Sequence, residues 1–436
     1  NEDRLNALLS NVTLFYLGIG VLAATILALF GRFGVGVFNL SPPELLTAQR
    51  LFYAAAALSI FSWPANLGGL ILSGLQEYVS LAKAAVSVTV AGILGTVWVV
   101  VTHQGSMALL IINGCTGIVG GTLCHLAARR RLPGLKLSLG KVSGAMMRVV
   151  FRISWVMFAF QICSIIIYQQ TDRVVLGLFV GAGAVALYEA PAKFQALVNQ
   201  LAGMTATAVL PAASQLEAEE RFETLQSLLL RGTKYVIAFL SPIVVALVVL
   251  ARPLLLHWLG PELVSQELAA QVFVSSWFIV GNVQVASVML TGMGRLKHIL
   301  RYAVAQTVAN IAISLALVRM LGVLGVVLGT VISSAGVVPF ILGYTLRTLN
   351  LDAKRWLRDV VAGTYPLLVV PAGLAIGCRM LGITNSLLGV AAAGALSVLA
   401  YWLTFYFLGL SPSERTELKE LASSALTRLR YAGGSR

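Results

Sequence analysis

Four charged residues stand close together in a stretch that is otherwise apolar. They are Asp172, Arg173, Glu189 and Lys193, in the run YQQTDRVVLGLFVGAGAVALYEAPAK (168–193). Long apolar segments flank this run on both sides, so its charged groups are expected at hydrocarbon depth. Unpaired charges are costly there and instead form ion pairs or line a water-filled cavity. The sequence therefore predicts a polar site inside a membrane.

The spacing of these residues predicts a helical hairpin. One helix runs outward to about Leu178, and the Gly181-Ala182-Gly183 break turns the chain into a second helix. Asp172 and Arg173 lie about as far before the turn as Glu189 lies after it. At roughly 1.5 Å of rise per residue, the two sets should face each other at nearly one depth.

The composition is that of a polytopic membrane protein. Of the 436 residues, 58% are hydrophobic, and the mean hydropathy is +0.88. A soluble domain could not keep so much apolar surface from water. The 41 glycines are typical of close helix packing in lipid. Because no alternating ten-residue strands are present, the expected fold class is all-α.

Hydropathy predicts twelve transmembrane helices joined by short loops. The expected domains are a partial four-helix N-terminal bundle (1–128), a basic cytoplasmic linker (129–151), a six-helix bundle (152–346), an extra helix pair (347–409) and a cytoplasmic tail (410–436). The twelve spans lie at about 11–30, 48–72, 80–102, 106–127, 152–178, 184–210, 234–251, 268–291, 302–319, 322–346, 361–378 and 387–409.

The basic residues predict an orientation. With the N-terminus, the linker and the C-terminal tail in the cytoplasm, 24 of the 31 Lys and Arg residues lie on the cytoplasmic side. Six lie outside, and Lys193 is within a span. This asymmetry follows the positive-inside rule. It also explains the net charge of +14 by attraction to anionic membrane lipids, so nucleic acid is not an expected partner.

A parallel internal repeat is visible at an offset of 218 residues. Ser73-Gly74 matches Thr291-Gly292, and Pro43-Glu44 matches Pro261-Glu262. Spans one to four therefore correspond to spans seven to ten, related by an axis along the membrane normal. The hairpin at 152–210 has no counterpart in the first copy. Continuing the offset backwards predicts two more N-terminal spans, and thus two six-helix bundles with an added pair.

Three smaller features carry structural expectations. The segment 214–233 is expected to form an amphipathic helix on the cytoplasmic face. Ser413 is expected to cap a short helix in the tail. The four cysteines all lie in apolar segments and are expected to be small core residues, and the scattered histidines lack metal-ligand spacing. No metal, cofactor or direct ATP use is expected.

Longer patterns resemble a known family. The run 171–194 is followed by TATAVLPAASQLEAE (205–219) and by LLLHWLGPE…LTGMGR (254–295). Together they resemble polysaccharide and oligosaccharide-lipid flippases of the multidrug/oligosaccharidyl-lipid/polysaccharide exporter superfamily. The likeness covers nearly the whole chain and is strongest over 151–344. It implies a fourteen-helix, two-bundle fold in the bacterial inner membrane, around a cationic central cavity. This chain departs from that pattern by lacking the first two helices.

The resemblance implies a transporter rather than an enzyme. Its cargo would be an undecaprenyl-pyrophosphate-linked glycan, such as an exopolysaccharide or O-antigen unit, flipped from the inner to the outer leaflet by alternating access. Glycan-assembly proteins of the same pathway are candidate partners. Arg suits phosphate oxygens through its two-pronged donor geometry, and Lys supplies a point charge. The candidate cavity residues are Arg148, Arg152, Asp172, Arg173, Tyr188, Glu189 and Lys193.

Each candidate has a structural alternative. Arg148 and Arg152 also fit topology-setting charges at the inner interface. The charged residues of the hairpin also fit an ion-pair cluster that never touches cargo. For function, the same fold would serve a peptidoglycan-precursor flippase or a drug or cation antiporter. A membrane glycan polymerase or glycosyltransferase is less favoured, because the predicted outer segments are short and carry few carboxylates.

Overall fold

The chain folds as α-helices that are suited to a membrane. The structure, a computed structural model, describes residues 2–38, 41–75, 77–132, 144, 147–148, 151, 171–417 and 419–420. These residues contain no strand, and they include 11 helices long and apolar enough to span a bilayer. The predicted all-α, multi-pass class is confirmed. The predicted span 152–178 lies mostly outside the described residues.

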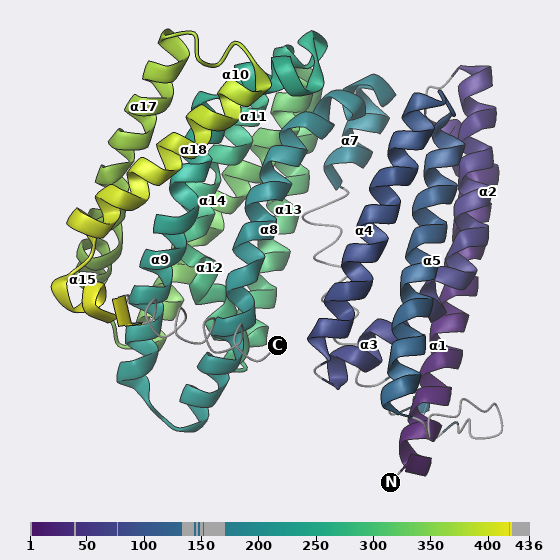
Figure 1. Cartoon of the computed structure of the whole chain (residues 1–436), viewed down its shortest axis with the longest axis horizontal. Coiled ribbons are helices and arrows are strands. Elements are labelled where there is room, and N and C mark those ends of the chain that lie inside the picture. Colours follow the sequence, from purple (N-terminus) through teal and green to yellow (C-terminus); the bar gives the residue numbers. More distant parts are fainter. Residues whose placement is uncertain are drawn as a thin grey trace, which may run out of the picture. The chain divides into compact units, whose positions relative to one another are not determined.

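The chain separates into two compact units, residues 1–161 and 162–436. The finer division made from the sequence stays a prediction. Figure 1 shows the helices in their chain order. The first unit contains α1 (Glu2–Leu29), η1 (Phe30–Gly34), η2 (Val35–Val37), α2 (Pro42–Ala65), α3 (Leu67–Gly74), α4 (Tyr78–Val101) and α5 (Ser106–Arg131).

The second unit begins, in its described part, with α7 (Thr171–Phe179) and α8 (Ala182–Ala218). Its remaining elements are α9 (Phe222–Val249), α10 (Ala251–Leu254), η5 (Leu255–Leu259), η6 (Pro261–Gln266), α11 (Glu267–Ser275), α12 (Trp277–Gly292), α13 (Leu296–Leu321), α14 (Val323–Thr348), α15 (Ala353–Trp356), η7 (Leu357–Val361), α16 (Ala362–Thr364), η8 (Tyr365–Leu368), α17 (Val369–Met380), α18 (Leu387–Thr404) and η9 (Phe405–Gly409).

The two units contain helices that pack in the same order. In the first, α1 packs on α2, α2 on α5, and α5 on α4. In the second, α9 packs on α12, α12 on α14, and α14 on α13. The helix ends also agree, because Gly74 and Gly292 close α3 and α12, while Tyr78 and Leu296 open α4 and α13. Equivalent ends and equivalent neighbours are what a parallel repeat requires.

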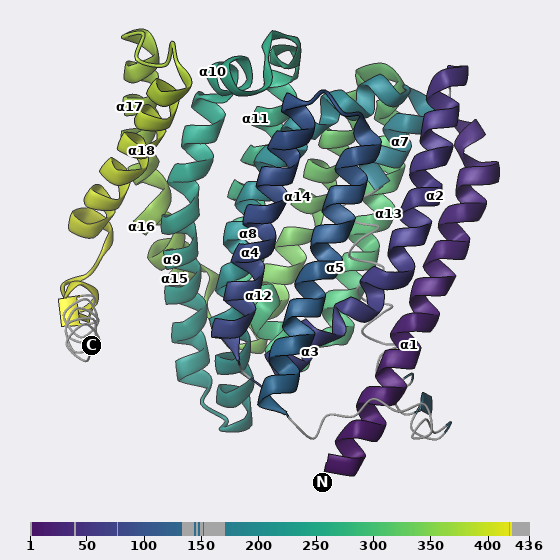
Figure 2. The ribbon, with the colours of Figure 1, turned by 45° about the vertical axis from the view of Figure 1, so that its right-hand side comes forward.

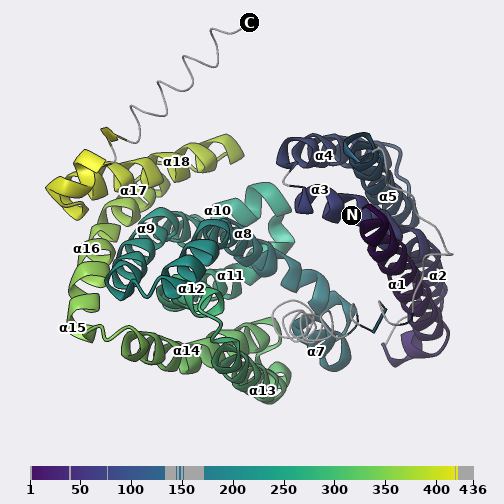
Figure 3. The same cartoon turned by 90° about the horizontal axis from the view of Figure 1, so that it is seen from below.

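The core of the second unit forms around α9 and α12. Figure 3 shows these two helices between the α13–α14 pair and the α17–α18 pair. Leu225, Leu240, Trp277 and Met289 are essentially fully buried there. In lipid, such packing stabilises the unit through van der Waals contacts and not through removal of apolar surface from water.

One end of the second unit is strongly basic. Consecutive helices run antiparallel, so the α8–α9, α12–α13 and α14–α15 connections share this end, and Figures 1 and 2 show them there. The opposite end carries Arg252, Arg319 and Arg379. The basic end carries Arg221, Arg231, Lys234, Arg295, Lys297, Arg301, Arg347, Lys354, Arg355, Arg358, Arg415 and Lys419.

Two local predictions were wrong. The segment 214–233 is no separate amphipathic helix, because α8 continues to Ala218 and α9 begins at Phe222. Charged residues favour a turn between them, and Glu220 takes a positive φ of 55°. The tail helix is capped by Ser411 rather than Ser413, because Pro412 suits the first helical position and the Glu414 carboxylate accepts the Ser411 backbone N–H at 2.8 Å.

The cysteine prediction holds in part for the three cysteines that the structure describes, and Cys163 lies outside the described residues. Cys124 and Cys378 are buried, as expected for small core residues. Cys115 is not in the core, because it lies on the exposed face of α5. Within the described residues, no group of three or more His, Cys, Asp or Glu is placed to hold a metal ion.

The capped tail is fastened to α9 by a buried ion pair. Lys234 Nζ lies 2.9 Å from Glu414 Oε2, and both side chains are largely buried. Burial raises the pKa of the Glu414 carboxyl, but hydrogen bonds from Lys234 and Ser411 more than offset this effect and leave the pKa below its ordinary value. The pair's stabilisation is therefore complete at neutral pH and is lost as the pH falls through this lowered pKa.

Glu414→Gln is expected to destabilise the second unit at neutral pH by up to about 3 kcal/mol, because it leaves Lys234 buried without a counter-charge. The difference from the unmodified protein should shrink as the pH falls below about 4. Thermal unfolding at several pH values measures it. Glu417→Gln, which removes the exposed partner of Arg231, is the matched control and should cost about 0.5 kcal/mol or less. Equal losses in the two variants would contradict the buried-pair account.

Candidate functional site

The predicted hairpin is present in the second unit. α7 ends at Phe179, the chain turns at Gly181, and α8 begins at Ala182. Gly181 has φ 114° and ψ 172°, a backbone conformation that is open essentially only to glycine. The turn therefore has a glycine where its geometry demands one, and α7 and α8 pack side by side.

The hairpin brings four of the predicted residues into contact. Arg173 Nε donates to Glu189 Oε1 at 2.6 Å, and the Arg173 guanidinium lies 5.7 Å from the centre of the Tyr188 ring. The Tyr188 hydroxyl donates to Asp172 Oδ2 at 2.7 Å. The Arg173–Glu189 pair is partly exposed, at 31% and 39% of the side chains, whereas Asp172 and Tyr188 are buried. A buried acid thus anchors the tyrosine beneath an accessible ion pair.

Asp172 also joins a polar seam between α13 and α14. The Thr330 hydroxyl lies 3.3 Å from Asp172 Oδ2 and accepts a hydrogen bond from Asn310 Nδ2 at 2.8 Å. Gln306 Nε2 donates to the Ser334 hydroxyl at 3.0 Å. The seam was not predicted from the sequence. Its signal was the spacing of Gln306, Asn310 and Ser314, which repeats every four residues on one face of a helix that is otherwise largely apolar.

Three oxygen atoms around this seam are buried without a hydrogen-bond donor in the described part of the chain. They are Asp172 Oδ1, Asn310 Oδ1 and Ser314 Oγ. A buried polar atom without a partner costs free energy. Intramembrane carboxylates that face a bundle interior, together with helix-borne oxygens, mark proton and ion pathways. The arrangement is chemically suited to a proton or a monovalent cation.

The exposed face of α8 continues the site away from the turn. Glu189, Lys193 and Gln200 share one helical face at spacings of four and seven residues, with the small Ala186 and Ala196 beside them. Lys193 and Gln200 are exposed, and Lys193 has no acidic partner among the described residues. α8 is long and apolar enough to span the bilayer. A lysine held there against acyl chains would be costly, so this face is suited to water or polar cargo.

The sequence also identifies a family. The profile of the family described as "Polysaccharide biosynthesis protein" matches residues 1–265. This chain belongs to that family. No curated protein sequence matched the chain.

Solved structures of other proteins share the fold of this chain. The structure described as "Lipid II flippase MurJ, inward closed conformation" superimposes with a TM-score of 0.68 at 16% identity, over 92% of this chain and 84% of that chain. An inward-facing multidrug resistance MATE family transporter of the MOP superfamily gives a TM-score of 0.68 at 17% identity, over 80% of this chain and 82% of that chain. The predicted exporter fold is therefore confirmed.

Two predicted residues lie outside the hairpin. Arg148 is exposed in its short described stretch, which fits either a cargo contact or a topology-setting charge. Arg152 lies outside the described residues. The roles of all seven predicted residues in cargo binding stay predictions.

Gly181→Ala is expected to destabilise the hairpin by about 1–3 kcal/mol, because a Cβ strains the backbone at this φ and ψ. Thermal unfolding of the purified protein measures the change. Gly183→Ala is the matched control: it lies in the helix with no other atom close to an added Cβ, so it should be neutral or slightly stabilising. A neutral Gly181→Ala would argue against the strained turn.

Proposed function

We propose that this protein is a flippase, and not an enzyme. It moves an undecaprenyl-pyrophosphate-linked oligosaccharide or polysaccharide repeat unit from the inner to the outer leaflet by alternating access. The observation that carries the proposal is the exposed α8 face, where Lys193 stands without an acidic partner among the described residues beside the Arg173–Glu189 pair. Its family, described as a polysaccharide biosynthesis protein, supports a glycan as the cargo.

The physical task is to move a pyrophosphate and a polar glycan across about 30 Å of hydrocarbon. Fixed cations along a wet face lower that barrier, while the polyprenyl tail stays in the bilayer. A cation antiporter would instead need a surplus of accessible acids. On the α8 face, the accessible acid Glu189 is already paired with Arg173, so the unpaired charge is that of Lys193. This balance favours an anionic cargo.

Arg173 is placed to exchange partners during transport. Its Nε is held by Glu189 at 2.6 Å, and its guanidinium is positioned by Tyr188. An arriving phosphate competes with Glu189 for the guanidinium, because Arg binds either oxyanion through the same two-pronged donors. Glu189 restores the pair when the phosphate leaves. The accessible pair thus works as a reversible counter-charge, with Lys193 one helical turn further along α8.

We also propose that a proton or monovalent cation drives the cycle from the seam at Asp172. This rests on the three buried oxygens that lack donors among the described residues. Tyr188 connects Asp172 to the transport face. Its hydroxyl donates a hydrogen bond to the Asp172 carboxylate, and its ring lies beneath the Arg173 guanidinium. A change of charge at Asp172 therefore alters how Tyr188 positions the Arg173–Glu189 pair, which contacts the cargo.

The proposed setting is the bacterial inner membrane, with both termini in the cytoplasm. The basic end of the second unit supports this orientation, because cytoplasmic ends collect Lys and Arg. Glycan-assembly proteins of the same pathway are the proposed partners. An exopolysaccharide or O-antigen unit is the proposed class of glycan.

Flipping by the full-length protein in liposomes tests the proposal. A fluorescent undecaprenyl-pyrophosphate oligosaccharide is placed in one leaflet, and its loss of accessibility to a membrane-impermeant quencher is followed. We expect protein-dependent exchange with no covalent change in the lipid. A covalently altered product would indicate an enzyme, and exchange of lipid II alone would indicate a peptidoglycan-precursor flippase. Exchange of neither, together with ion-driven drug uptake, would indicate an antiporter.

A further inference from the structure

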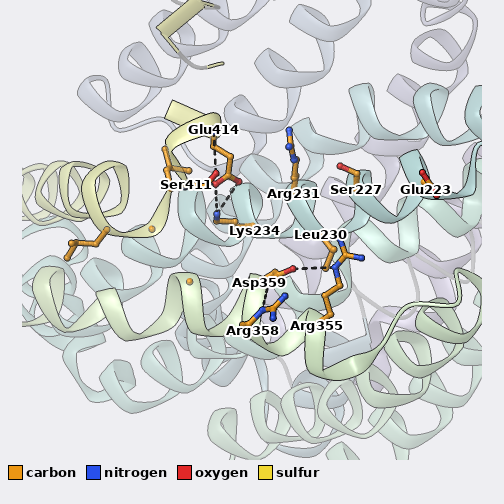
Figure 4. A pocket seen from close by; sticks show the side chains of 14 residues that line it. Glu223, Ser227, Leu230, Arg231, Lys234, Arg355, Arg358, Asp359, Ser411 and Glu414 are labelled. Carbon is orange, nitrogen blue, oxygen red and sulfur yellow. Dashed lines mark hydrogen bonds and ion pairs between the residues drawn. The ribbon is translucent and has the colours of Figure 1, made fainter. Parts of the chain in front are cut away.

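A polar cavity lies at the basic end of the second unit, away from the hairpin turn. It encloses about 560 Å³ between the first half of α9, the α15–η7 segment and the tail that follows η9. Figure 4 shows Lys234 and Glu414 joined on one side, with Arg355 and Arg358 on either side of Asp359. Three candidate membrane spans have their ends here. The cavity therefore lies at the level of the lipid headgroups.

Positive charges outnumber negative charges around Asp359 in this cavity. Arg358 Nε lies 2.9 Å and Arg355 Nε lies 3.6 Å from its two oxygens, so two guanidiniums share one carboxylate. The terminal NH₂ groups of both arginines have no acceptor in the described part of the chain. Both side chains are more than half exposed, at 54% and 76%. Guanidinium NH₂ groups are donors that can bind phosphate oxygens in two-pronged fashion.

An apolar pocket adjoins this basic cavity. It encloses about 410 Å³ and is lined mainly by aromatic side chains, among them Tyr235, Phe239, Trp402 and Phe405. Leu410 lines both spaces, and Tyr235 follows Lys234 directly in α9. Phe239 and Trp402 stack with ring centres 5.6 Å apart. A basic cavity that continues into an aromatic pocket at a membrane surface suits a molecule with an anionic head and an apolar tail.

We propose that this pair of spaces is a binding site for an anionic phospholipid. The headgroup phosphate binds the NH₂ groups of Arg355 and Arg358, and one acyl chain lies in the aromatic pocket. The lipid joins α9 to the last two spans at the end where the Lys234–Glu414 pair fastens the tail. This site is separate from the α8 face and does not depend on the proposed cargo.

Native mass spectrometry of the purified full-length protein in detergent tests the proposal. We expect one phosphatidylglycerol to bind more tightly than phosphatidylcholine. Arg355→Gln with Arg358→Gln should weaken phosphatidylglycerol binding by at least about tenfold, because both charge-assisted contacts to the phosphate are lost. Arg301→Gln with Arg347→Gln removes the same charge from exposed residues that do not line the cavity, and should leave this binding unchanged. Equal affinity in the two double variants would overturn the proposal.

Asp359→Asn provides a test that misfolding cannot mimic. Removing the shared carboxylate frees both guanidiniums, so phosphatidylglycerol should bind more tightly than to the unmodified protein. Unchanged or weaker binding in a variant with normal thermal stability would contradict the assigned headgroup site. Inorganic phosphate and short-chain phosphatidylglycerol separate the possible ligands. Neither should displace the long-chain lipid at equal concentration, and displacement by phosphate would make this a site for free anions and overturn the lipid assignment.

Discussion

Lys193→Ala is expected to slow flipping about ten- to a hundredfold, because a charge-assisted contact to phosphate contributes about 1.5–3 kcal/mol. The protein itself should be undisturbed, since Lys193 is exposed and has no acidic partner in the described part of the chain. Expression and thermal stability should therefore match the unmodified protein. Lys193→Arg should retain most of the activity, because the positive charge remains.

Lys354→Ala is the matched control for this prediction. Lys354 is an exposed lysine near the start of α15 that does not line the α8 face, so its removal should leave flipping unchanged. The flipping assay in liposomes measures both variants at equal protein density. Normal flipping by Lys193→Ala would remove the main support for a cationic cargo path.

Exchanging the charges of Arg173 and Glu189 tests whether this ion pair is structural or functional. Arg173→Ala should slow flipping, but it also leaves Glu189 unpaired, so the single variant is ambiguous. Arg173→Glu combined with Glu189→Arg restores an ion pair with the positive charge moved from α7 to α8. Full recovery of flipping in the double variant would mean that the pair only holds the hairpin together. We expect recovery of stability without full recovery of transport.

Asp172→Asn is expected to fold and yet lose the response of flipping to an imposed proton or sodium gradient. An amide has nearly the shape of the carboxylate, and its oxygen can still accept a hydrogen bond from the Tyr188 hydroxyl. In the unmodified protein this hydroxyl lies 2.7 Å from Asp172 Oδ2. The negative charge that would attract a cation is gone. The flipping rate is measured with and without each gradient. A bound ion that contributes about 1.4 kcal/mol stimulates the unmodified protein about tenfold. This stimulation should be absent in Asp172→Asn.

Two controls accompany Asp172→Asn. Ser333→Ala alters the same seam but removes only a hydroxyl that bonds back to the Thr330 carbonyl, so gradient stimulation should persist. Asp172→Leu leaves Tyr188 and Thr330 without their acceptor and is expected to lower thermal stability as well. A gradient response in Asp172→Asn that equals that of the unmodified protein would place the coupling ion elsewhere.

The hairpin was predictable because its determinants are local. Gly181 marks the turn, and a fixed rise per residue sets Arg173 opposite Glu189. The membrane class and the repeat were predictable for the same reason. Hydropathy and the repeated Pro-Glu and Ser/Thr-Gly pairs can be read directly from the sequence. These features depend on spacing along one or two helices and need no knowledge of distant neighbours.

The polar seam was out of reach because it depends on distant packing. Asp172 and Thr330 are 158 residues apart and meet only once α7 has settled against α14. The wrong amphipathic helix at 214–233 has a different cause. Its charges were assigned to one surface helix, but they belong to the ends of two long helices that extend beyond their apolar parts. Periodicity alone does not reveal where a helix breaks.

The close fit of α13 and α14 has a consequence for motion. A Cβ on Gly325 would come within 2.6 Å of the Leu317 carbonyl oxygen, and one on Gly329 would collide with Ser314, so the two backbones touch. Hydrogen bonds from Gln306 and Asn310 tie the helices further along. Two helices joined so tightly move as one rigid body, and bending is left to the connections that enter α13 before Leu296 and leave α14 after Thr348.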